Sequence, residues 1–225
     1  MKLDLIHHHC DRFATYLEKN YPLDELYRYE CIQNFQTHWN FAAEDFQGMY
    51  DRSLSSKVSN RLWGGSRHSA KSIMLEFIKL NPDYVKLAFR DLFSADRDLV
   101  MRIDRFKLHC DELLSQLRSV DSRFNAHHHD TSAICLYLAF QLPAEYCLFE
   151  YEIFAQSLER LGTKQIPQPY EIDRYMKLTR IIHTFMMKNE SVVEQYTRLL
   201  KDPMYFQPPS LMMTADFYHF VGLRS

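Results

Sequence analysis

The sequence contains little glycine, because only five of its 225 residues are Gly. Average usage is about 7%, and a chain with few glycines forms few tight β-turns, so this shortage favours helices. Long apolar runs are also missing, since no stretch approaches the ~18 apolar residues of a membrane span. Residues 1–10 are neither basic nor a long apolar run, so we expect no signal peptide. These absences argue against a membrane protein.

Paired cysteines and a strong net charge are missing as well. The five cysteines are odd in number and irregularly spaced, and no C-x-x-C occurs, which is typical of free thiols in a reducing compartment. The formal net charge of −2 argues against a protein that coats DNA through bulk positive charge, although it leaves room for a local basic face. We therefore expect a cytoplasmic protein.

The sequence also lacks recognisable catalytic signatures. The chain has no NTPase signature and no legible Ser/His/Asp or Cys/His nucleophile arrangement. Glu150 and Glu152 lie two positions apart, which places them on the same side only in an extended segment. The sequence therefore predicts a chain that is not itself an enzyme and that uses no cofactor.

Aromatic residues, by contrast, are abundant, with 16 Phe, 14 Tyr and 2 Trp, and such side chains fill the space between helices. Apolar residues recur at steps of three and four along most of the chain, which is the helical period. Residues 32–46 carry one such stripe, and Gly48 is the expected end of that helix. These patterns predict an all-α fold with about nine or ten helices.

Polar and turn-forming residues mark where several of these helices begin and end. A short polar side chain caps a helix start, and a glycine often ends one. The expected N-caps are Asn81, Asp96 or Asp98, and Asp130 or Thr131. Gly162 is the expected C-cap of a helix that covers residues 153–161.

Changes in composition divide the chain into three segments. Residues 1–61 hold N-terminal helices and a Ser-rich loop, residues 62–161 a central helical core, and residues 162–225 the C-terminal helices. The clearest rigid break lies at residues 166–169, which contain two prolines. We expect one continuous domain, with two lobes that meet near Gly162–Pro169 as the alternative.

Two histidine clusters are candidates for metal binding, residues 7–9 followed by Cys10 and residues 127–129 followed by Asp130. Neutral imidazoles beside a thiol or a carboxylate are good metal ligands. Adjacent side chains diverge on a helix or a strand, so a metal site would have to combine residues from both clusters. The alternative is solvated histidines at the ends of elements, and the sequence predicts no metal.

The turn Trp63-Gly64-Gly65 is the first candidate binding site, because two of the five glycines are adjacent there. Such a turn before a helix exposes backbone N–H groups to an anion. Arg67 and Lys71 would add positive charge, and Trp63 could stack on a base. The alternative is a structural turn with Trp63 buried in the core.

A second group of candidate contacts lies on the segment from Arg97 to Lys107. Arg102 and Arg105 could bind phosphates, although interleaved aspartates balance the charge, which is typical of a solvated helix face. A further candidate basic surface lies on the outside of the helix expected at residues 172–187. It comprises Lys177, Arg180, His183 and Lys188.

Several short motifs from Phe35 to Phe220 resemble the helical region that precedes the AAA+ motor in some McrB-like restriction ATPases of bacteria. The first are Leu-Trp-Gly-Gly-Ser (62–66), Met-Leu-Glu-Phe-Ile-Lys (74–79), Asn-Pro-Asp-Tyr-Val (81–85), Phe-Arg-Asp-Leu-Phe (89–93), Arg-Ile-Asp-Arg-Phe (102–106) and Cys-Asp-Glu-Leu-Leu (110–114). The later ones are Leu-Tyr-Leu-Ala-Phe (136–140), Pro-Ala-Glu-Tyr (143–146), Leu-Gly-Thr-Lys-Gln-Ile-Pro (161–167) and Asp-Phe-Tyr-His-Phe (216–220).

The resemblance implies a role in modification-dependent restriction and phage defence. In such proteins the N-terminal part generally recognises DNA, often a methylated base that it flips from the stack. The motor domain, which carries the nucleotide-binding and hydrolysis residues, would follow in the same chain or act as a separate partner. This chain would then be a non-catalytic recognition module that contacts DNA through Trp63, Arg67, Lys71, Arg102 and Arg105.

Two other functions remain open from sequence. The chain could be a protein-interaction adaptor, or a sensor of a phage component, with an exposed aromatic patch and no basic rim. It could instead be a small-molecule sensor with a closed polar and aromatic cavity. A basic patch would favour the DNA-binding module over both alternatives.

Overall fold

The computed structural model describes residues 1–63 and 66–224, except for the side chains of residues 66–68. Within these residues it contains eleven α-helices and no strand, and 68% of the chain is helical. The predicted all-α fold is therefore confirmed, with one helix more than expected. None of the described helices is both long and apolar enough to cross a membrane.

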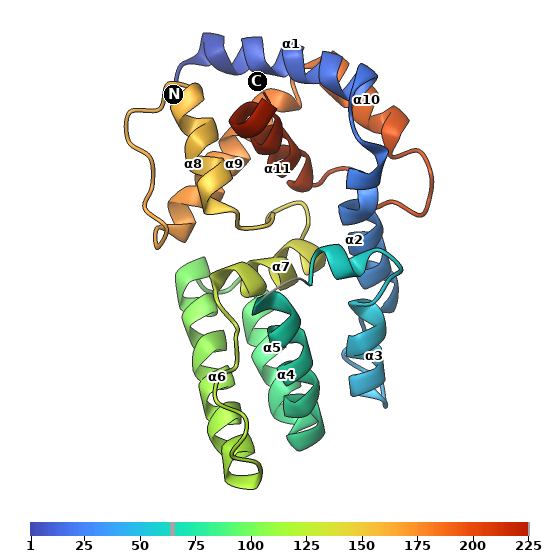
Figure 1. Ribbon diagram of the computed structural model, residues 1–225, viewed down its shortest axis with the longest axis vertical. Helices are drawn as coiled ribbons and strands as arrows, with labels where there is room; N and C mark the ends of the chain where they lie inside the picture. Colours follow the sequence, from blue (N-terminus) through green and yellow to red (C-terminus); the bar gives the residue numbers. More distant parts are fainter. Residues whose placement is uncertain (64–65, 225) are drawn as a thin grey trace. The chain divides into compact units, whose positions relative to one another are not determined.

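The chain forms two compact units (Figure 1). Unit 1 comprises residues 1–29 and 143–225, and unit 2 comprises residues 30–142. These units do not follow the segments 1–61, 62–161 and 162–225 that composition suggested. The chain leaves unit 1 after Tyr29 and returns to it at Pro143. Composition along the sequence does not show that these two distant segments belong to one unit.

Unit 1 begins with α1 and a short 3₁₀ turn, and it resumes with α8 after the chain returns. Its elements are α1 (Leu3–Lys19), η1 (Leu23–Leu26), α8 (Tyr151–Arg160), α9 (Ile172–Met186), α10 (Glu190–Leu199), α11 (Met212–His219) and the π-helical turn η3 (Phe220–Arg224). Helix α1 packs on α9 and α10, and α8 packs on α11 and η3.

Unit 2 holds the longest helix of the described chain. Its elements are α2 (Tyr27–His38, which starts in unit 1), α3 (Phe46–Ser53), η2 (Ser59–Arg61), α4 (Ser66–Leu80), α5 (Pro82–Phe93), α6 (Leu99–Val120) and α7 (Thr131–Gln141). Helices α4, α5 and α6 pack against one another (Figure 1). Three predicted caps are confirmed here, because Asn81, Asp98 and Asp130 accept from a backbone N–H of the next helix at 3.1, 2.9 and 2.8 Å.

The single helix predicted over residues 32–46 is wrong. Helix α2 ends at His38, and α3 begins only at Phe46. The Asp45 side chain caps α3 by accepting from the Gly48 N–H at 2.8 Å, so Gly48 lies in the first turn of a helix instead of ending one. A Cβ at Gly48 would lie only 2.0 Å from Asp45 Oδ2, so a side chain at position 48 would displace this cap.

The core of unit 2 surrounds α7. All residues of this helix from Ala133 to Phe140 are buried, and the ring of Tyr137 lies among the rings of Phe89 and Phe106, with centroid distances of 5.1 and 6.1 Å. The Tyr137 hydroxyl has a 2.7 Å hydrogen bond with the Tyr50 hydroxyl. A buried polar group needs such a partner, and this bond therefore fixes the ring of Tyr137 in the core.

The core of unit 1 is built around a buried carboxylate, Asp216. One oxygen accepts from Arg28 at 2.6 Å, and the other accepts from the hydroxyls of Tyr21, Tyr29 and Tyr196 at 3.1, 2.8 and 3.0 Å. Burial, followed by the negative charge of Asp216, raises the pKa of Tyr29 well above its usual value, so this hydroxyl stays a neutral donor. The charge of Asp216 is thus balanced by Arg28 and satisfied by four donors.

Candidate functional site

Trp63 is packed into the core of unit 2. The Trp63 side chain is only 4% exposed, and its indole N–H donates to the Leu54 carbonyl at 3.0 Å. The ring lies beside Tyr137, with a centroid distance of 6.2 Å. This burial matches the structural alternative, and no face of the indole ring is available to stack on a base.

Of the two positive charges predicted beside this turn, only Lys71 is among the described side chains. Gly64, Gly65 and the side chain of Arg67 lie outside the described residues. Lys71 forms an ion pair with Asp51 at 2.9 Å and donates to Ser55 Oγ at 2.6 Å. The hydrogen bond from Lys71, together with the charge of Lys71, lowers the pKa of Asp51, although partial burial acts in the opposite direction.

The arginines of α6 are also held by protein groups. Arg102 is buried, and its Nε donates to the Leu92 carbonyl at 2.8 Å. Arg105 lies on the surface and pairs with Asp91 at 2.8 Å, and Arg97 approaches the same carboxylate at 3.7 Å. Arg102 is therefore a structural residue in this conformation, and Arg105 belongs to a surface ion-pair group.

A groove in unit 1 gathers positive charge that the sequence did not single out as a whole. Its volume is about 880 Å³. It is lined by Met1, Lys2, Gly162, Thr163, Lys164, Gln165, Arg174, Lys177, Leu178 and Ile181. We call it the basic groove, because four of these side chains are cationic and no carboxylate is among the described residues that line it.

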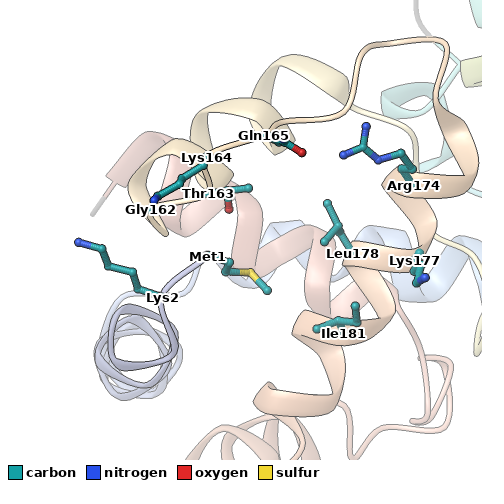
Figure 2. A pocket seen from close by; sticks show the side chains of 10 residues that line it. All are labelled: Met1, Lys2, Gly162, Thr163, Lys164, Gln165, Arg174, Lys177, Leu178 and Ile181. Atoms are coloured by element: carbon teal, nitrogen blue, oxygen red, sulfur yellow. The ribbon is translucent and has the colours of Figure 1, made fainter.

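Figure 2 shows how the basic groove is assembled from three separate segments. Lys2 comes from the residues before α1, and Lys164 from the connection after α8. Arg174 and Lys177 lie on α9, where they face away from the buried stripe of that helix. Apolar side chains, Leu178 among them, lie between the two cationic sides (Figure 2).

The connection after α8 is positioned by Gly162. This residue has a φ of +69°, a left-handed conformation that glycine adopts without strain. The Gly162 and Thr163 N–H groups donate back to the Glu159 and Leu158 carbonyls, each at 2.9 Å, and close the end of α8. The Lys2 N–H donates to the Leu161 carbonyl at 3.0 Å, which fixes the start of the chain beside this turn.

The cations of the basic groove differ in how they are paired. Arg174 forms a 2.7 Å ion pair with Glu171, whose carboxylate also accepts from the Gln168 N–H at 2.7 Å. These bonds, the backbone one first, lower the pKa of Glu171. Lys2, Lys164 and Lys177, by contrast, have no carboxylate partner among the residues that the structure describes.

The four residues predicted to form a basic surface on α9 lie in different surroundings. Lys177 lines the basic groove. Arg180 donates to the Glu145 carbonyl at 3.2 Å, and His183 is half-buried with its Nδ1 3.0 Å from Thr214 Oγ1. Lys188 lies 5.7 Å from the ring centroid of Phe185 and lines a separate cavity.

Sequence reasoning missed Lys2, Lys164 and Arg174 as members of one site. These residues lie up to 172 positions apart in the chain. The helix-ending role of Gly162 was visible in the sequence, and Lys164 follows it by two residues. A positive residue after a predicted turn was therefore the only available signal, and it could not indicate which other cations lie nearby.

The histidines at 127–129 are placed differently from either expectation. His127 and His129 come together with Cys110 of α6, and one donor atom from each lies within 4.8 Å of the others. His128 has a φ of +57°, and its side chain is exposed. The segment is thus not helical here. The side chains of His127 and His129, two positions apart, approach one another, whereas side chains at this spacing diverge on a regular helix.

Comparisons with protein-family models, with curated proteins and with solved structures gave no match to this chain.

Proposed function

We propose that this chain is a non-catalytic recognition module that binds DNA through the basic groove of unit 1. The observation that carries the proposal is a set of lysines around one concave surface, Lys2, Lys164 and Lys177, for which the described part of the chain offers no carboxylate partner. Lysine is a flexible point charge that binds phosphate, and it needs no fixed bidentate geometry to do so. Unpaired lysines in one groove therefore favour a ligand that carries phosphates.

The apolar part of the basic groove favours a ligand that is more than an inorganic anion. Leu178 and Ile181 lie between the cations, and Tyr170, on the same connection as Lys164, is 80% exposed. A nucleotide offers both a charged phosphate and a flat base that packs on apolar or aromatic side chains. The groove volume of about 880 Å³ lies in the range of small-ligand sites, so it can hold a single extruded nucleotide.

The resemblance to McrB-like N-terminal regions supplies the choice of DNA and the biological setting. On this proposal the module acts in modification-dependent restriction, with an AAA+ motor in the same chain or as a separate partner. The module works in the cytoplasm, where its five free cysteines stay reduced. The net charge of −2 argues against binding through bulk positive charge, so a local basic surface such as the groove has to attract the phosphates.

Binding to short duplexes tests the proposal. Unmodified duplexes and duplexes with modified cytosine are titrated with the protein at low salt, and Kd is measured by fluorescence anisotropy. The double variant Lys164→Ala/Lys177→Ala is expected to bind about tenfold more weakly, because two phosphate contacts are lost. A preference for the modified duplex would support the role in modification-dependent restriction.

The matched control removes two exposed lysines of unit 1 that lie outside the groove. Lys19→Ala/Lys201→Ala has the same net charge as the groove variant, so it reports any effect of overall charge alone. The proposal requires this control to bind nearly as well as the wild type. Equal weakening by both double variants, or no binding of any duplex at low salt, would overturn it.

A further inference from the structure

The cluster of Cys110, His127 and His129 in unit 2 has the chemistry of a metal site. Cys110 lies on α6, and both histidines lie on the connection between α6 and α7. One donor atom from each side chain lies within 4.8 Å of the other two. Cys110 and His129 are buried and His127 is half-buried, so the site would be shielded from competing solvent on most sides.

The imidazole of His129 has one nitrogen without a hydrogen-bond partner in the described part of the chain. Its Nε2 lies 3.3 Å from the Tyr137 hydroxyl, which is itself bonded to Tyr50 at 2.7 Å. Its Nδ1 is buried and has no hydrogen-bond partner among the described residues. When Nε2–H donates to Tyr137, the lone pair of Nδ1 is free to bind a cation, which is the usual way a second partner orients a ligating histidine.

The burial of His129 also suits a role as a metal ligand. The side chain of His129 is only 1% exposed, and its Nδ1 is buried without a hydrogen-bond partner among the described residues. Neutral imidazole is the form that binds metals. A buried polar nitrogen without a partner normally costs stability, and a metal ligand would remove that cost.

His127 is held by two contacts that a metal would have to share or replace. Its Nδ1 accepts from the His129 N–H at 3.0 Å, and its Nε2 lies 3.3 Å from Asp111 Oδ1. Asp111 follows Cys110 in the chain and its side chain is largely exposed. The carboxylate of Asp111 can therefore either complete the ligand set or accept from His127 as a second partner.

We propose that Cys110, His127 and His129 bind one zinc ion, with water or the carboxylate of Asp111 in the fourth position. A thiolate with two imidazoles selects zinc over magnesium or calcium, which prefer oxygen ligands. Ligand atoms around tetrahedral zinc lie about 3.5 Å apart, and the donors lie within 4.8 Å of one another, so they need to approach by about 1.3 Å at most. Binding releases the thiol proton of Cys110 to solvent, and both imidazoles enter as neutral donors.

Cobalt substitution tests this site on the full chain. Co²⁺ is titrated into metal-free protein, and the absorption spectrum is recorded. The expected result is a thiolate-to-cobalt charge-transfer band, with visible bands of a tetrahedral ion, that saturates at one equivalent and is bleached by Zn²⁺. A titration with no charge-transfer band would overturn the proposal, and this measurement requires no variant to fold.

Four variants then assign the ligands. Cys110→Ala is expected to abolish the charge-transfer band, and His129→Ala to weaken Co²⁺ binding at least tenfold. The controls Cys31→Ala and His128→Asn change another buried cysteine of unit 2 and the exposed neighbour of the ligands, and both should keep the band. Circular dichroism checks that each variant is folded. Loss of the band in Cys31→Ala and its survival in Cys110→Ala would contradict the assignment.

Discussion

Several basic side chains have different partners in the two units. In unit 2, Lys71 and Arg105 pair with carboxylates and Arg102 is buried against a backbone carbonyl. In unit 1, Lys164 and Lys177 line a groove and have no carboxylate partner among the described residues. Basic side chains of the same types are therefore paired at these positions of unit 2 and lack a carboxylate partner at these positions of unit 1, which a count of charges along the sequence cannot distinguish.

The units also differ in how they bury polar groups. Unit 1 encloses a charged carboxylate, Asp216, with an arginine and three tyrosine hydroxyls. Around Tyr137, unit 2 instead encloses uncharged partners, the hydroxyls of Tyr50 and Tyr137, with the ring of His129 beside them. Removing a partner from a buried charge costs more than removing one from a neutral pair, so the two cores should respond differently to single substitutions.

The largest loss of stability is expected from substitution of Trp63 in unit 2. Trp63→Ala removes a buried indole and its hydrogen bond to Leu54, and such truncations cost about 3–5 kcal/mol. The free energy of unfolding, measured in urea, should fall by this amount. Trp63→Phe keeps an aromatic ring and should cost less, and DNA binding by this variant should equal that of the wild type. A loss below about 1 kcal/mol for Trp63→Ala would contradict the burial of this side chain.

The second largest loss of stability is expected from substitution of Asp216 in unit 1. Asp216→Asn keeps the size of the side chain but leaves the buried Arg28 guanidinium with Glu25 as its remaining acidic partner, at 3.0 Å. We expect a loss of about 3 kcal/mol in the free energy of unfolding. Tyr21→Phe removes only one of the four donors and should cost about 1 kcal/mol. Equal losses for the two variants would show that the charge of Asp216 is not the central feature of this core.

A pH-dependent effect is expected from His183, which is half-buried on α9. Burial lowers the pKa of His183 below its usual value of 6.5, so the unfolded chain binds this proton more readily than the folded chain does. Stability is therefore greatest above pH 6.5 and falls as the pH decreases from there toward the folded pKa. Urea unfolding across this window should show the fall, and His183→Gln should reduce it. A variant whose stability profile matches that of the wild type would rule His183 out as its source.

The smallest effects are expected at the paired surface cations of unit 2. Lys71→Ala and Arg105→Ala each break an ion pair at or near the surface, and such pairs contribute about 0–1 kcal/mol. Neither variant should weaken DNA binding by more than about twofold, since both cations already have partners. A tenfold loss of affinity in Arg105→Ala would move the DNA-binding surface from unit 1 to unit 2.

Local signals in the sequence predicted much of the fold but little of the site. Asn81, Asp98, Asp130 and Gly162 cap helices as expected, because a cap depends on a few neighbouring residues. The stripe over residues 32–46 failed, since residues 39–45 form a non-helical link between α2 and α3, in which no residue is fully buried. The basic groove and the Cys110 cluster join residues far apart in sequence, and their proximity depends on packing that periodicity does not report.

The salt dependence of DNA binding tests the central claim most directly. The logarithm of the binding constant is measured against the logarithm of salt concentration for the wild type and for Lys164→Ala/Lys177→Ala. Each phosphate contact contributes about 0.9 to the slope, so the double variant is predicted to reduce its magnitude by about two, while Lys19→Ala/Lys201→Ala leaves it unchanged. Parallel slopes for the wild type and the groove variant would contradict the account.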